Sequence, residues 1–155
     1  MNTDARTYVA VVDDDESFCR SLDRLLRAAG FRSITYQSAE DFLKDDKRPR
    51  FDCLLLDIKL PGISGLELQQ RIQSDPAPIP IIFVTSQNTP QLRKEAQNSG
   101  ARAYFLKTDP GERIVDCIRR LAARPSSTTD FFNQGSLFQK DNNSNLTITV
   151  GRKPP

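Results

Sequence analysis

The sequence predicts an α/β protein in which a five-stranded parallel sheet is covered by five helices. Short apolar runs alternate with amphipathic segments of helix length over residues 8–123, and this alternation is typical of βαβ units. The third run, residues 51–56, is apolar at nearly every position, as expected of a strand that is buried on both faces. Four of the five runs end beside an acidic, hydroxyl or ammonium side chain. This placement favours a ligand site at one end of the sheet.

The first two strands and helices follow from the spacing of apolar residues. Residues 8–12 form the first predicted strand, and the helix after it ends at Gly30, a residue type common just beyond a helix. The second strand covers residues 31–36, and Ser38 begins a short helix that turns Phe42 inward. The apolar residues of the first helix recur at helical spacing: they are Phe18, Leu22, Leu25, Leu26 and Ala29.

Turn and capping signals define the middle of the chain. The third strand, residues 51–56, is followed by a turn at residues 60–62. Ser64 and Glu67 have the spacing of a capping box, which predicts the start of the third helix. The fourth strand is predicted at residues 79–84.

The fourth helix has the weakest apolar stripe. Thr89 is its predicted cap, and only Leu92 and Ala96 are apolar on one face, so we expect this helix to be the least firmly packed. The fifth strand covers residues 101–106, and residues 109–112 open a last helix. The inward-facing residues of that helix are Ile114, Ile118 and Leu121.

The composition changes after residue 124. We expect one domain over residues 1–124 and a polar tail over residues 125–155, which is rich in serine, threonine, asparagine and aspartate. Such a composition favours disorder. The alternative is partial docking, because residues 146–150 alternate like a strand and several apolar side chains precede them: Phe131, Phe132, Leu137 and Phe138.

Charge and hydropathy exclude several classes of protein. The net charge is only +2, and the interspersed signs lack the clustered basic face of a nucleic-acid binder. No apolar stretch approaches the ~20 residues that span a bilayer, and residues 1–7 lack the apolar centre of a signal peptide. We therefore expect a cytoplasmic protein with no direct DNA binding and no membrane segment.

The counts of histidine and cysteine narrow the chemistry further. The chain contains no histidine, which excludes Ser-His-Asp and Cys-His catalysis and imidazole metal sites. Cys19, Cys53 and Cys117 lie far apart without the spacing of a metal or redox motif. We expect them to be buried, reduced thiols.

Three carboxylates should meet at the carboxyl ends of the strands, where ligands bind to open parallel sheets. Asp13 and Asp14 follow the first strand, and Asp57 follows the third. Three adjacent acids repel one another unless a cation compensates them, and Mg²⁺ prefers such oxygen ligands. Mg²⁺ together with the ammonium of Lys107 would balance the three carboxylates. The alternative for the first acidic run is simple capping of a helix N-terminus.

Asp57 is the best candidate for a nucleophile. It follows three consecutive leucines, where a carboxylate is costly unless it is paired. A carboxylate can accept a phosphoryl group, and transfer then requires positioning and charge neutralisation. Lys107 could supply charge and Thr85 a hydroxyl, although each could also be an ordinary residue at the end of a strand.

These motifs resemble the response-regulator receiver domains of two-component signalling. The matching elements are VVDDDES at 11–17, LLLDIKLPGISG at 54–65, FVTS at 83–86 and FLK at 105–107. They cover residues 7–123 in the order and at the spacing of the family, with most similarity to the nitrogen-fixation type of regulator. The resemblance implies a flavodoxin-like, doubly wound sheet with the strand order 2-1-3-4-5.

The resemblance also implies roles for the residues of the acidic site. Asp57 would be the phosphoacceptor, and the phosphohistidine of a sensor histidine kinase or phosphotransfer protein would be the donor. Mg²⁺ would be held by Asp14, Asp57 and the backbone carbonyl of Lys59, with Asp13 contributing through water. The chain would then be no enzyme beyond its own phosphorylation and dephosphorylation.

Two further roles concern the response to phosphorylation. Thr85 and Lys107 would grip the phosphoryl group, and Tyr104 would act as a switch that turns inward when Thr85 moves. The alternative for Tyr104 is a half-exposed strand aromatic. The signal would pass to a downstream protein, or to a second copy of the chain through the fourth helix, the fifth strand and the fifth helix.

The chain departs from the family pattern at two points. Thr108 follows Lys107, where the family usually has a proline, often after a cis bond. Because a cis bond to a residue other than proline costs ~3–4 kcal/mol, we expect a trans bond, which leaves the reach of Lys107 open. The DNA-reading helix-turn-helix of the nitrogen-fixation type has no match in this sequence.

Two other functions fit parts of the pattern. One is a receiver-like interaction module that is not phosphorylated, a reading that Thr108 favours and the complete set of acids opposes. The other is a Mg²⁺-dependent phosphatase with an aspartyl intermediate. Such an enzyme should carry a general acid two residues after the nucleophile, and Lys59 stands there instead.

Overall fold

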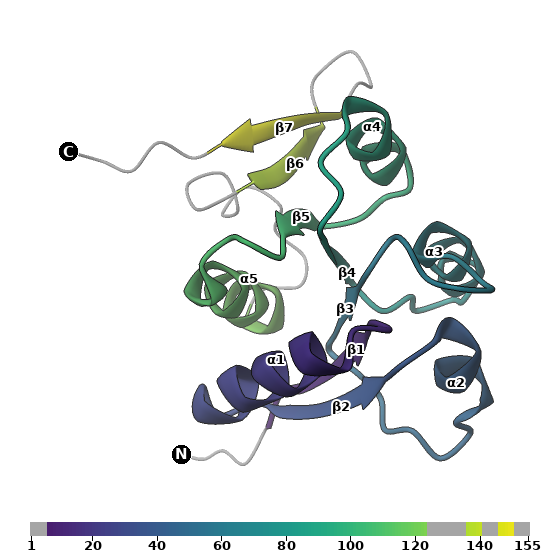
Figure 1. Ribbon diagram of the computed structural model, residues 1–155, viewed down its shortest axis with the longest axis vertical. Helices are drawn as coiled ribbons and strands as arrows, with labels where there is room; N and C mark the ends of the chain where they lie inside the picture. The colour runs from purple at the N-terminus through teal and green to yellow at the C-terminus, as the bar shows by residue number, and fades with distance from the viewer. Residues whose placement is uncertain (1–5, 124–135, 141–145, 151–155) are drawn as a thin grey trace.

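The five predicted strands and five predicted helices are all present in a computed structural model, which describes residues 6–123, 136–140 and 146–150 (Figure 1). The strands are β1 Tyr8–Val12, β2 Arg32–Tyr36, β3 Cys53–Leu56, β4 Ile81–Thr85, β5 Ala103–Leu106, β6 Ser136–Lys140 and β7 Leu146–Val150. The helices are α1 Glu16–Ala28, α2 Ala39–Lys44, α3 Gly65–Gln73, α4 Pro90–Asn98 and α5 Gly111–Ala123. None of these helices is long and apolar enough to cross a bilayer.

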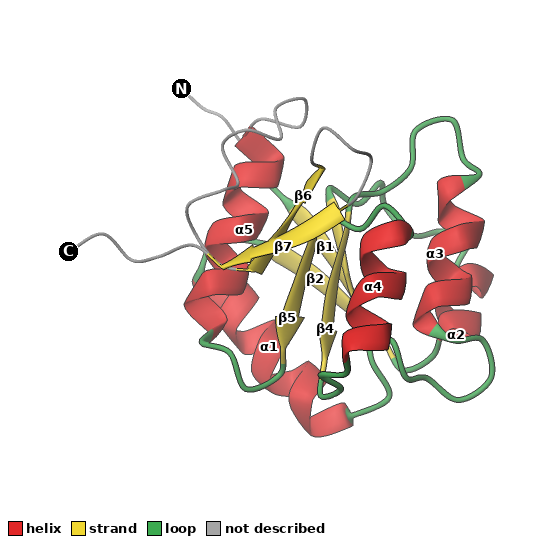
Figure 2. Ribbon diagram, turned by 90° about the horizontal axis from the view of Figure 1, so that it is seen from above, coloured by secondary structure: helices red, strands yellow, loops and turns green. Residues whose placement is uncertain are grey.

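The sheet has the predicted parallel core with the order β2-β1-β3-β4-β5. Helices α1 and α5 cover one face, and α2, α3 and α4 cover the other (Figure 1). The prediction of a flavodoxin-like, doubly wound fold is therefore confirmed. Figure 2 shows the strands of the parallel core between these two helical layers.

Each face of the sheet has its own apolar core, because successive strand residues point to opposite sides. In β1, Val9 and Val11 join the core under α1 and α5, while Ala10 and Val12 join the core under α2, α3 and α4. All four are almost fully buried. This explains why the strands are apolar at consecutive positions rather than at alternate ones.

Local capping residues set the ends of the helices as predicted. Ser64 and Glu67 form the complete capping box at the start of α3, and Thr89 caps α4 by accepting a hydrogen bond from the Leu92 amide. Among the nine residues of α4 only Ala96 is buried. The expectation that α4 is weakly packed is thus confirmed.

Several strands are shorter at their start than the apolar runs suggest. The fourth strand begins at Ile81 rather than at residue 79, because Pro80 has no N–H group to give to the sheet. It continues to Thr85, which pairs with Leu106 of β5. The apolar pattern alone does not reveal where a neighbouring strand stops pairing.

Two segments of the predicted tail add strands to the sheet. β6 pairs antiparallel with β5 at Ala103 and Leu137, and β7 pairs antiparallel with β6, so that the five parallel strands become part of a seven-stranded sheet. β7 lies beside α4 (Figures 1 and 2). The remaining residues of the predicted tail lie outside the described ranges, so disorder there and the domain boundary at 124 stay predictions.

Candidate functional site

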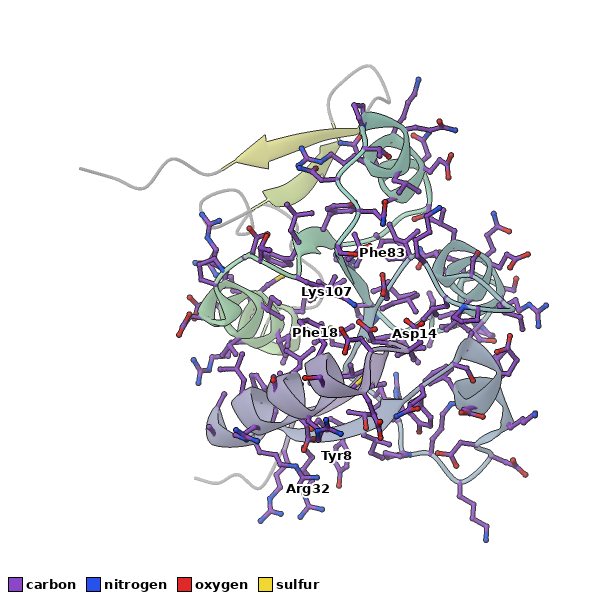
Figure 3. All side chains as sticks on the ribbon, in the orientation of Figure 1. Tyr8, Asp14, Phe18, Arg32, Phe83 and Lys107 are labelled. Atoms are coloured by element: carbon purple, nitrogen blue, oxygen red, sulfur yellow. The ribbon has the colours of Figure 1, made fainter. Side chains whose placement is uncertain are left out.

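Four of the predicted site residues lie at the carboxyl ends of neighbouring strands, whereas Tyr104 lies within β5. Asp13 follows β1, Asp57 follows β3, Thr85 is the last residue of β4, and Lys107 follows β5. Because these strands pair in parallel, the four positions lie at the same end of the sheet. Figure 3 shows Asp14 and Lys107 near the centre of the molecule, between the two helical layers.

The three aspartates form a compact carboxylate cluster. Oxygen atoms of Asp13, Asp14 and Asp57 lie within 4.8 Å of one another. Asp13 and Asp57 are buried, with 2% and 5% of their surface exposed, whereas Asp14 is exposed. Asp14 is therefore open to solvent, and the other two carboxylates form the buried part of the site.

Capping of α1 is the task of Asp15 rather than of the whole acidic run. Its carboxylate accepts a hydrogen bond from the Phe18 amide at 3.1 Å, and its own amide donates to Asp13 Oδ1 at 2.9 Å. The helix N-terminus thus needs neither Asp13 nor Asp14 as its cap. The capping interpretation accounts for Asp15 and for Glu16 in the first turn of α1, whereas Asp13 and Asp14 belong to the cluster.

Lys107 reaches the cluster although Thr108 follows it. All peptide bonds of the described residues, including Lys107–Thr108, are trans, as predicted. The Lys107 ammonium lies 2.8 Å from Asp13 Oδ2 and 3.2 Å from Asp57 Oδ2. The absence of the usual proline therefore does not prevent this contact.

Burial and charge shift the titration of this ion pair. Burial raises the pKa of the Asp13 carboxyl above its ordinary value, although the hydrogen bond from Lys107 acts in the opposite direction. Burial alone lowers the pKa of Lys107, but the hydrogen bond to Asp13 and the charge of Asp57 outweigh it and raise that pKa. Three carboxylates facing one ammonium leave two negative charges uncompensated. A divalent cation with oxygen ligands fits this balance.

Two backbone features hold Asp57 in place. Its amide donates to the Val12 carbonyl at 3.0 Å, and its Oδ1 lies 3.4 Å from the Lys59 amide. A Cβ atom at Gly65 would lie 2.0 Å from the Asp57 carbonyl oxygen, so only glycine fits there. Gly65 was not among the residues predicted for the site, although it lies between Ser64 and Glu67 of the predicted capping box.

Thr85 is connected to Tyr104 through Gln87, another residue that the sequence reasoning did not identify. The Thr85 hydroxyl accepts a hydrogen bond from the Gln87 amide at 3.2 Å, and the Tyr104 hydroxyl donates to the Gln87 carbonyl. Tyr104 is only 2% exposed, so the interpretation as a half-exposed aromatic is wrong. The Arg93 guanidinium of α4 lies 6.0 Å from the centre of its ring.

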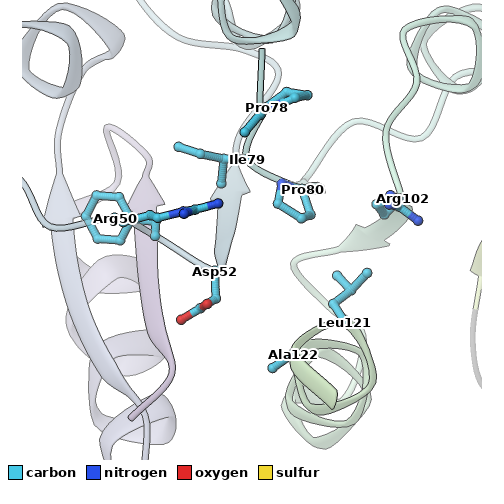
Figure 4. Close-up of a pocket in the computed structure, with 10 residues that line it drawn as sticks. Arg50, Asp52, Pro78, Ile79, Pro80, Arg102, Leu121 and Ala122 are labelled. Atoms are coloured by element: carbon cyan, nitrogen blue, oxygen red, sulfur yellow. The ribbon is translucent and has the colours of Figure 1, made fainter. Parts of the chain in front are cut away.

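A separate cavity of about 370 Å³ lies at the opposite end of the sheet. Residues before β3, β4 and β5 and the end of α5 line it (Figure 4), and none of the predicted site residues is among them. This cavity and the converging chemistry therefore lie at different places. We assign the functional site to the carboxylate cluster, because charged and hydroxyl groups from four strands meet there.

Comparisons with known proteins agree with this assignment. The family model of the response regulator receiver domain matches residues 9–119. The chain is 31% identical over 117 residues to the response regulator protein TodT of Pseudomonas putida, covering 76% of this chain and 52% of TodT. It is 32% identical over 111 residues to the transcriptional regulatory protein FixJ of Bradyrhizobium diazoefficiens, covering 72% of this chain and 54% of FixJ. This chain thus spans about half the length of both relatives.

A solved structure shows the same fold. The receiver domain protein (CheY-like) from Methanospirillum hungatei JF-1 superposes with a TM-score of 0.69 at 25% identity. The match covers 75% of this chain and 93% of that one. A unit of this kind therefore forms nearly all of a chain that was solved on its own.

Proposed function

Since this chain belongs to the response regulator receiver domain family, we propose that Asp57 accepts one phosphoryl group from the phosphohistidine of a sensor histidine kinase or phosphotransfer protein. The observation that carries the proposal is the contact of one ammonium, that of Lys107, with both buried carboxylates, Asp13 and Asp57. An oxygen of Asp57 forms a bond to phosphorus while the bond between phosphorus and the donor imidazole breaks. The electron pair of that bond leaves with the imidazole nitrogen.

Mg²⁺ is the proposed cofactor of this transfer. Asp14, Asp57 and the backbone carbonyl of Lys59 are its proposed ligands, and Asp13 contributes through a water molecule. The uncompensated charge of the carboxylate cluster supports this assignment. When bound, the ion neutralises charge on the phosphoryl oxygens. Residues of the chain itself provide the other contacts.

Lys107 and Thr85 are the proposed contacts of the transferred group. The Lys107 ammonium already lies at Asp57 Oδ2, so it can stay beside that carboxyl group when it is phosphorylated and pair with the new phosphoryl oxygens. Thr85 ends the neighbouring strand β4 with a buried side chain, and its hydroxyl can donate to a phosphoryl oxygen. Movement of Thr85 would reach Tyr104 through Gln87, and this is the proposed switch.

The output is proposed to be a protein contact made in the cytoplasm. A downstream protein, or a second copy of the chain, would bind at α4, β5 and α5, the elements next to Tyr104. The chain would act on no substrate other than its own Asp57. The alternative is a receiver-like module that binds partners without phosphorylation, and the experiment below distinguishes the two.

Acetyl phosphate and Mg²⁺ provide the direct test. Mass spectrometry should detect one added phosphoryl group on the parent protein and on Asp46→Asn, which changes an exposed acid far from the cluster. Asp57→Asn should take up none, because an amide oxygen is a much weaker nucleophile than a carboxylate. Equal labelling of Asp57→Asn and the parent would contradict the proposal, and no labelling of any protein would favour the unphosphorylated module.

A further inference from the structure

The ring of Phe18 lies against the ammonium of Lys107. The Lys107 Nζ atom is 4.9 Å from the centre of the ring, within the ~6 Å over which a cation is attracted to an aromatic face. Figure 3 shows the two side chains adjacent to each other, one from α1 and one from the end of β5. The ring is half-buried and packs against the core under α1 and α5.

The backbone of Phe18 is tied to the loop that carries the carboxylates. Its amide donates to Asp15, whose own amide donates to Asp13 Oδ1. Two hydrogen bonds along one short segment therefore fix the backbone of Phe18 relative to the Asp13 carboxylate. The position of the ring then depends on its packing against the core under α1 and α5.

The backbone of Lys107 is held by a hydrogen bond from its amide to the Thr85 carbonyl at 2.9 Å, but its long side chain needs support of its own. A lysine side chain loses much rotational freedom when it is fixed. The ammonium contacts Asp13 and Asp57 on one side. The face of Phe18 adds a third contact, and only 16% of the Lys107 side chain remains exposed.

We propose that Phe18 is a positioning residue that holds the Lys107 ammonium between Asp13 and Asp57 through the face of its ring. The kinetic consequence of this contact rests on the proposed phosphorylation of Asp57, but the contact itself does not. The test therefore has one part that needs no phosphoryl transfer.

The first part is a double-mutant cycle on the stability of the full chain. Phe18→Leu keeps an apolar side chain but removes the aromatic face, and Lys107→Met removes the charge. Phe18→Leu should lower the denaturation midpoint clearly in the parent and much less in the Lys107→Met background. Phe31→Leu is the matched control: it alters a ring of the same core that faces Arg119 rather than Lys107, so its shift should be the same in both backgrounds.

The second part measures the rate of phosphorylation by acetyl phosphate with Mg²⁺. Phe18→Leu should slow the reaction about two- to fivefold, the lower end of what a cation–π contact can supply. Phe18→Tyr keeps the aromatic face and should restore the parent rate. A purely structural role of Phe18 predicts instead that Phe18→Leu lowers stability without slowing the reaction of the folded protein.

The outcomes separate the two proposals. Equal midpoint shifts for Phe18→Leu in both Lys107 backgrounds overturn the positioning role, whatever the kinetics. Coupling in the cycle with a parent that takes up no phosphoryl group supports the contact and overturns the proposed function. Coupling together with slower phosphorylation and rescue by Phe18→Tyr supports both.

Discussion

Burial decides the chemistry of individual ionisable residues in this molecule. Cys19, Cys53 and Cys117 are free and buried, which confirms the expectation of buried, reduced thiols. Burial raises the pKa of Cys19 to about 11 and that of Cys117 to about 12. Because the thiolate is the reactive form, these thiols should be inert near neutral pH.

The raised pKa of Cys117 predicts a loss of stability at alkaline pH. An unfolded thiol ionises near pH ~8.5, so the folded state binds more protons above that pH, and stability falls between pH ~8.5 and about 12. Below pH ~8.5 the contribution is fully present. Cys117→Val fills a similar volume without ionising. The difference in unfolding free energy between the parent and this variant should decrease above pH ~8.5 by at most about 1.4 kcal/mol per pH unit. A constant difference from pH 7 to 10, measured with urea, would contradict it.

At the scale of elements, the weakly packed helix α4 lies close to β5, which is linked to the site through Tyr104. α4 has one buried residue, Ala96, and its C-terminal end is held to α3 by a hydrogen bond from Gln69 to the Ser99 carbonyl at 2.7 Å. The hydrogen bonds from Thr85 through Gln87 to Tyr104 connect β4 with β5. A change at Thr85 can therefore move the loop before α4 with little loss of apolar contact.

Removal of one hydroxyl should test this link. Tyr104→Phe keeps the buried ring but loses the hydrogen bond to Gln87. Phosphorylation of Asp57 should remain intact. The changes in amide exchange that phosphorylation causes over residues 85–120 should become smaller. Tyr36→Phe is the control, because the Tyr36 hydroxyl donates instead to Asp45 after α2. If the exchange of the parent protein changes instead in α1 and residues 31–46, the output face lies beside the edge strand β2. The Tyr104 switch would then be wrong.

For the stability of the whole molecule, the charge of the carboxylate cluster matters more than the net charge of the chain. The chain carries only +2 overall, yet two negative charges at the carboxyl end of the sheet lack a counterion among the described residues. Like charges at this distance destabilise the folded state. The folded protein should therefore gain stability from a divalent cation.

Mg²⁺ should raise the unfolding temperature, and the increase should continue with the logarithm of the free metal concentration above Kd. The gain follows RT ln(1 + [L]/Kd), which is about 2.7 kcal/mol when the free metal is at 100 times Kd. Asp14→Ala should abolish this gain and leave the metal-free protein no less stable, because Asp14 is exposed and its removal relieves repulsion. Glu16 is an exposed acid of α1 that pairs with Arg20. The Glu16→Ala variant should respond to Mg²⁺ like the parent. An equal gain in the Asp14→Ala variant would show that the ligand assignment is wrong.

The order of the elements and the location of the site could be predicted from local patterns. Alternating apolar and amphipathic segments predict βαβ units, and capping residues such as Ser64 and Thr89 mark helix ends, because both signals depend on neighbours a few residues away. Asp57 and Lys107 could be placed at one edge for the same reason, since each directly follows an apolar strand. The start of β4 was missed because Pro80 interrupts pairing within an apolar run.

The contacts between these residues could not be predicted from local patterns, because they depend on the packing of the whole fold. Lys107 and Asp13 are 94 positions apart, and their contact depends on how β5 and β1 are set by the strands between them. The same holds for the ring of Phe18 at Lys107, for the close approach of Gly65 to Asp57, and for β6 at the edge of β5. Local patterns encode periodicity, whereas these contacts depend on packing between elements that are distant in sequence.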